Sequence, residues 1–121
     1  MFQYYNANPY GRNVHDCTVR AISLATGQPW DDTYVELSEY ARKQGITFSE
    51  VEFINNYLSK RYTRYCPDRK IIHTIQDFLD LRLKGTFLIT MTDHITCVID
   101  STVYDTFDCR DKFFWCVYRV K

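Results

Sequence analysis

The stretch NVHDCTVRAIS, residues 13 to 23, places Cys17 between a polar turn and a run with the apolar spacing of a helix. A thiol is a useful nucleophile only as the thiolate, and the free N–H groups at a helix N-terminus favour negative charge there. The other four cysteines fall in a predicted loop or in predicted strands, where no such field is expected. The sequence therefore singles out Cys17 as a candidate nucleophile, with a small buried residue as the alternative interpretation.

A cysteine nucleophile needs a general base, and the base needs a group that orients it. His94 begins a predicted strand, and a two-residue turn at Asp100 and Ser101 would place Asp105 diagonally beside it on one face of the sheet. A three-residue turn would shift the pairing by one and bring Asp108 to that face instead. We expect Asp105, which is nearer the hairpin, to orient His94, with Asp108 as the alternative third member.

The remaining cysteines and histidines fit no common pattern of disulfides or metal ligands. Five cysteines, at 17, 66, 97, 109 and 116, are an odd number without a CxxC pair, which is typical of free thiols in a reducing cytosol. A zinc site from Cys109, Cys116 and a histidine would need a cysteine spacing of seven, which matches no common ligand hairpin. We therefore expect no metal and no other cofactor. His15 is expected to be solvated or on the substrate side, and His73 to be a surface residue.

Length and charge limit the classes of protein that this chain can be. With 121 residues it fits one compact domain, residues 1–121, and its formal net charge of 0 gives no long-range field to attract nucleic acid or an anionic membrane. The start lacks the basic and apolar regions of a signal peptide, and the longest apolar run, FFWCVY, is far short of the roughly 20 residues that span a bilayer. We expect a soluble, cytoplasmic protein that does not bind membranes.

The first two-thirds of the chain carries the apolar periodicity of helices. Asp16 is expected to accept hydrogen bonds at the start of a helix that begins near Cys17 and ends before Gly27. Thr74 is expected to cap a short helix in the same way. The predicted helices cover about 17–26, 30–44, 49–58 and 74–83.

The last third of the chain changes to the composition of strands. Four segments rich in β-branched and aromatic residues follow one another with short breaks, at about 86–92, 94–100, 102–108 and 113–120. They predict a four-stranded antiparallel meander on which the N-terminal helices pack, in an α+β domain. Residues 60–70 are expected to be an irregular connection with at most a short strand.

Two stretches carry a family resemblance. N-x-x-D-C-T-V-R-A-I-S-x-A-T-G, residues 13–27, with D-H-I-T-C-V-I-D-x-x-V-Y-D-T-F-D, residues 93–108, resembles the papain-like cysteine peptidases. More closely, it is similar to small phage and bacterial proteins of that fold, akin to the peptidase domains that trim bacteriocin leaders. The order Cys, His, Asp is that of the papain clan. The middle of the chain matches only in being helical.

The resemblance implies a papain-like fold and a cysteine hydrolase, a peptidase, isopeptidase or acyl transferase that works through an acyl-enzyme on a peptide or protein substrate. It implies Cys17 as nucleophile, His94 as base and Asp105 as its orienter, and the host cytoplasm as location if a phage encodes the chain. Papain-like enzymes usually place a Gln several residues before the cysteine, and this chain lacks it. Asn13 is the expected substitute as a donor to the oxyanion.

Two other function classes are also compatible with the sequence. A papain-like scaffold without turnover could serve as a binding or inhibitory module, for instance a phage protein that captures a host partner, since 17% of residues are aromatic and 10 are tyrosines. The segment KRYTRYCPDRK, residues 60–70, could bind single-stranded nucleic acid, because five basic residues alternate with Tyr62 and Tyr65. The neutral balance of the chain argues against this second alternative.

Overall fold

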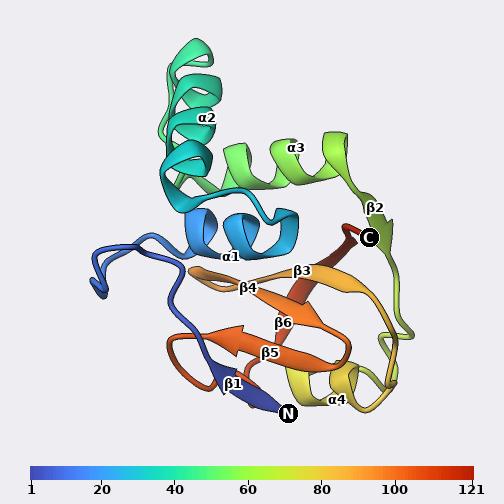
Figure 1. Cartoon of the computed structure of the whole chain (residues 1–121). Coiled ribbons are helices and arrows are strands. Elements are labelled where there is room, and N and C mark those ends of the chain that lie inside the picture. Colours follow the sequence, from blue (N-terminus) through green and yellow to red (C-terminus); the bar gives the residue numbers. More distant parts are fainter.

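The computed structural model describes residues 1–121 and has the α+β architecture that the sequence predicts. Figure 1 shows α1, α2 and α3 grouped on one side of the sheet, with α4 apart from them. The elements in chain order are β1 (Phe2–Tyr4), α1 (Cys17–Thr26), α2 (Trp30–Lys43), α3 (Val51–Arg61), β2 (Thr63–Tyr65), α4 (Ile75–Leu79), β3 (Thr86–Met91), β4 (His94–Ile99), β5 (Thr102–Asp105) and β6 (Phe114–Arg119).

The helices begin close to their predicted starts, with two corrections of detail. Gly27 ends α1 in the left-handed conformation, as its position predicts. The Asp16 side chain makes no capping hydrogen bond, so its predicted capping role is wrong, because other side chains occupy its carboxylate. Thr74 does cap α4, in a reciprocal capping box with Asp77. That helix ends at Leu79, earlier than expected.

The sheet differs from the predicted four-stranded meander. It has six strands in the order β1-β5-β4-β3-β6-β2, and it is mixed because β1 runs parallel to β5. The last strand pairs with β3 and not with β5, since β1 occupies the free edge of β5. The short strand β2 lies inside the predicted irregular connection and pairs with β6. A three-residue strand such as β1 has no periodicity from which to predict it.

The β4–β5 hairpin has the register that places His94 near Asp105. Ile99 pairs with Thr102, so the loop holds two residues, as the favoured count assumes. Asp100 and Ser101 both have positive φ, 47° and 67°, which is the backbone of a type I′ turn. This turn matches the right-handed twist of the strands, and it is formed here without glycine.

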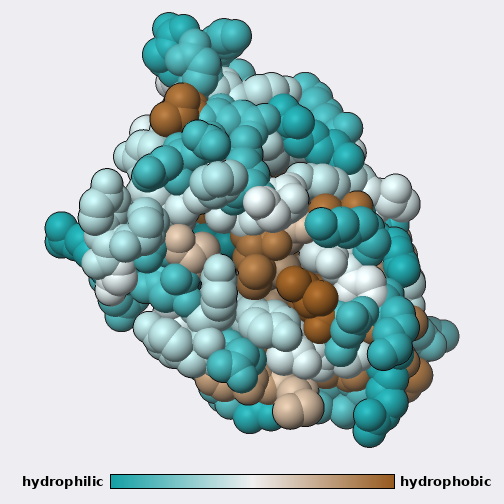
Figure 2. Space-filling model, in the orientation of Figure 1, coloured by the Kyte–Doolittle hydropathy of each residue, from teal (hydrophilic) through white to brown (hydrophobic).

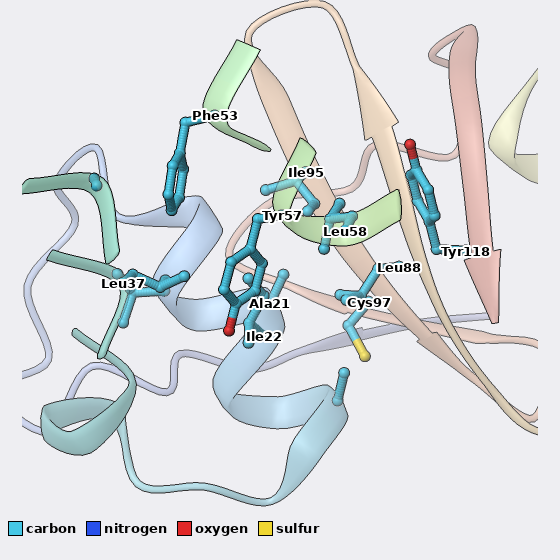
Figure 3. Packing of buried hydrophobic residues seen from close by; sticks show 13 residues of the cluster. Ala21, Ile22, Leu37, Phe53, Tyr57, Leu58, Leu88, Ile95, Cys97 and Tyr118 are labelled. Carbon is cyan, nitrogen blue, oxygen red and sulfur yellow. The ribbon is translucent and has the colours of Figure 1, made fainter. Parts of the chain in front are cut away.

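Apolar side chains fill both faces of the sheet because successive strand residues point to opposite sides. On one face, Leu88 and Cys97 belong to the core beneath α1, α2 and α3, part of which Figure 3 shows. On the other face, Phe87 and Val98 pack with Phe78 of α4. The two layers hold the central strands rigidly between them. None of the helices combines the length and apolar character that crossing a membrane requires.

The surface seen in Figure 2 is mostly hydrophilic or intermediate. A small group of hydrophobic side chains appears near the middle of this face, where helices and sheet meet in Figure 1.

Candidate active site

Cys17 is the first residue of α1, and its half-buried side chain lines a hollow of the surface. Burial raises the pKa of this thiol, but the hydrogen bond and charge of His94 act against burial, as do the Ile95 backbone and the charge of Arg20. The pKa of Cys17 therefore lies below its ordinary value. Besides the helix N-terminus, the neighbouring imidazole of His94 thus also favours the thiolate form of Cys17.

His94 is the first residue of β4, and its ring lies between Cys17 and Asp105. Its Nε2 lies 2.6 Å from Asp105 Oδ2, which leaves Nδ1 as the nitrogen available to the thiol. Burial lowers the pKa of His94, but the hydrogen bonds and charges of Asp105 and Cys17 outweigh burial and raise it to about 9. At neutral pH His94 is therefore an imidazolium, and its charge favours the thiolate form of the neighbouring Cys17.

The Asp105 carboxylate is 3 % exposed and has donors on both oxygens. Oδ1 accepts the backbone N–H of Thr106 at 2.7 Å and Nη1 of Arg20 at 3.2 Å, and Oδ2 accepts from His94. Burial alone raises the pKa of Asp105, but the bonds to His94 and to Thr106 lower it below its ordinary value. Asp105 is thus a fixed anion that holds the imidazole in one orientation.

The two remaining predicted site residues differ in their position. Asn13 lines the same hollow as Cys17 and His94. Asp108 is exposed and forms an ion pair with Arg110 at 2.7 Å, and Asp105 occupies the place beside His94. The alternative third member is therefore not the partner of the histidine.

Two hollows meet at the Cys17–His94 pair. One, of about 560 Å³, is bordered by Asn13, Phe107 and Lys112. The other, of about 760 Å³, lies between α3 and β6 and is bordered by Val51, Ile54 and Trp115 among other apolar side chains. Both hollows include His15, which is exposed. A chain lying across the pair would contact both.

Arg20, Thr106 and Phe107 take part in the site and were not identified from the sequence. The Phe107 ring lies 4.7 Å from the His94 ring and covers it. Arg20 contacts the carboxylate of Asp105 from a helix 85 residues away in sequence. Its one signal in the sequence is its place four residues after Asp16, a spacing at which helical side chains meet.

Two of the other thiols have surroundings that disfavour reactivity. Burial raises the pKa of Cys97 and that of Cys109 to about 12. His94, Asp105 and Cys109 are the group whose ligand atoms lie near enough together, within 4.8 Å, to hold a metal. Tetrahedral zinc keeps its ligand atoms about 3.3 Å apart or more. The 2.6 Å between His94 Nε2 and Asp105 Oδ2 fits a hydrogen bond better than a shared ion.

Comparison of the chain with protein-family models, with curated proteins and with solved structures gives no match.

Proposed function

We propose that this chain is a papain-like cysteine hydrolase, a peptidase, isopeptidase or acyl transferase that acts on a peptide or protein. The observation that carries the proposal is that Cys17 and His94 lie side by side at the meeting point of two surface hollows, with His94 hydrogen-bonded to Asp105. Nucleophile, base and orienter in contact are the parts that acyl transfer through a thiol requires.

The proposed reaction has two halves. The Cys17 thiolate attacks the carbonyl carbon of the substrate, and the oxygen becomes an anion that the N–H groups at the start of α1 and the carboxamide of Asn13 stabilise. His94 donates its Nδ1 proton to the departing amine, which leaves a thioester on Cys17. His94 then accepts a proton from water as water attacks the thioester, and the thiol is released. In a transferase an amine would take the place of water.

Asp105 supports both halves because His94 changes its charge in each. The carboxylate accepts the Nε2 proton throughout, so Nδ1 remains the nitrogen that exchanges protons with Cys17 and with the substrate. The raised pKa of His94, about 9, keeps the imidazolium present at neutral pH as an acid for the first half.

Selective alkylation tests the proposal. Iodoacetamide near neutral pH should modify Cys17 faster than the exposed Cys66. Mass spectrometry of peptides locates the modified cysteines. Cys17→Ala should lose the fast reaction, His94→Ala should slow it, and the matched control Cys66→Ser should keep it. Equal rates at Cys17 and Cys66 in the folded wild type would refute the proposal.

The positions of the aromatic side chains favour a hydrolase over the two alternative functions. Many of them, such as Tyr57 and Phe53, are buried in the core and cannot serve as contact residues for a partner. In residues 60–70, Tyr62 and Tyr65 pack against the two core clusters, so they are not free to stack on bases. Exposed aromatic side chains such as Phe113 and Trp115 border the hollows beside Cys17, where they would serve a substrate as well as a binding partner. The nucleic-acid hypothesis gains no specific observation.

A further inference from the structure

The guanidinium of Arg20 joins two buried carboxylates, one beside the start of α1 and one on the sheet. Its Nε donates to Asp16 Oδ1 at 2.8 Å, and its Nη1 donates to Asp105 Oδ1 at 3.2 Å and to Thr106 Oγ1 at 3.1 Å. The side chain is 10 % exposed. A guanidinium has donors in a rigid planar fork, so it can hold two acids in a fixed relation that a lysine ammonium cannot reproduce.

Asp16 balances the charge of this guanidinium. Its carboxylate is 4 % exposed, and Oδ2 accepts from Asn8 Nδ2 at 3.2 Å and from Trp30 Nε1 at 3.0 Å. An arginine bound to Asp105 alone would offset the negative charge that His94 needs. With Asp16 on its other side, the group Asp16–Arg20–Asp105 keeps a net charge of about −1 for the imidazolium.

We propose that Arg20, held by Asp16, is a positioning residue that fixes the Asp105 carboxylate against His94 without cancelling its charge. This inference rests on the proposed function, because it concerns the same nucleophile and base. Arg20 makes no hydrogen bond to the thiol or to His94; beyond the effect of its charge on Cys17, it acts through Asp105. It lies three residues after Cys17 on α1, so one helix turn sets both the nucleophile and the anchor of the base.

This arrangement of Asp16, Arg20 and Asp105 explains why Asp16 is buried although it does not cap α1. Its carboxylate takes up the Trp30 and Asn8 donors and thereby ties α2 and the N-terminal segment to the guanidinium. A movement of α1 relative to the sheet would break the Arg20–Asp105 contact and the Cys17–His94 contact together.

The rate of Cys17 alkylation tests the inference, with Arg42→Ala as the matched control because Arg42 is an exposed arginine paired with Glu39 on α2. Arg20→Ala should slow alkylation near neutral pH by about tenfold or more, and Arg42→Ala should leave it unchanged. Arg20→Lys, which keeps the charge and loses the fork, should stay well below wild type. Added methylguanidine should restore part of the rate in Arg20→Ala and none in Asp105→Ala, an effect that loosened packing does not give.

Asp16→Asn provides a second measurement that does not depend on the rate. It removes the balancing charge, so the His94 pKa measured by NMR of its ring protons should fall by about 1 relative to wild type. A folded Arg20→Ala that reacts at the wild-type rate, or an unchanged His94 pKa in Asp16→Asn, would overturn the inference. If wild-type Cys17 reacts no faster than Cys66, the proposed function itself fails. If wild-type Cys17 is reactive but the Arg20 and Asp16 variants keep its alkylation rate and the His94 pKa, only the positioning role is refuted.

Discussion

The charge of Asp105 can be removed while its shape is kept, by Asp105→Asn. In the wild type the His94 pKa of about 9 exceeds its ordinary 6.5 by about 2.5, which corresponds to about 3 kcal/mol in favour of the imidazolium. Asp105 and Cys17 supply this preference against the cost of burial, and the Asp105 hydrogen bond is the larger favourable contribution. Because burial opposes them, the two contributions together exceed this net preference, so if Asp105 supplies more than half, its loss costs at least about 2 kcal/mol and lowers the His94 pKa by at least about 1.5.

The consequence for the thiol has a definite direction. Between the lowered pKa of Cys17 and the His94 pKa of about 9, the imidazolium stabilises the thiolate. In Asp105→Asn the upper limit of this range should fall below about pH 8, and the Cys17 pKa should rise because the neighbouring cation is lost earlier.

Two spectroscopic titrations measure this change. NMR of the histidine ring protons follows His94, with His15→Gln and His73→Gln variants to assign the three signals. The thiolate absorbance near 240 nm, taken as wild type minus Cys17→Ala, follows Cys17. An Asp105→Asn protein that folds and still titrates His94 near pH 9 would refute the role of this carboxylate.

Three further outcomes follow from the structure. The pKa of Asp105 is lowered from 3.8, so its ionisation stabilises the fold above that pH, and this stabilisation is lost as pH falls through its folded-state pKa. When the protein is acidified below about pH 4, the Tm of Asp105→Asn, measured by circular dichroism, should therefore fall less than the Tm of the wild type. Thr74→Ala removes the α4 cap and should lower the free energy of unfolding in urea by about 1 kcal/mol, whereas an equal stability would contradict the capping box. Gly85 has φ 114°, and a Cβ there would lie 2.7 Å from the Lys121 carbonyl oxygen. Gly85→Ala should therefore lower the free energy of unfolding in urea by about 1–3 kcal/mol, and an unchanged stability would refute the close approach.

Local patterns in the sequence were enough to predict α1, the β4–β5 hairpin and the positions of Cys17, His94 and Asp105. Each depends on a helix period, a strand period or a turn length, which neighbouring residues determine. The place of β6 beside β3 could not be read in this way, because it depends on β1 having taken the edge of β5. That competition involves segments about 100 residues apart, and no local pattern encodes it.

Asp16 shows why the remaining part of the site was missed. A buried acid next to a helix start looks like a cap from its sequence position, because capping is the local use of such a residue. Its actual partners are a tryptophan 14 residues later, an asparagine 8 residues earlier and the guanidinium of Arg20. The carboxylate accepts hydrogen bonds from these donors, because leaving them unpaired in the interior would cost more than a helix cap contributes. A pair of side chains set by one strand register, such as His94 and Asp105, is thus predictable, whereas the charges around the pair depend on which elements pack together.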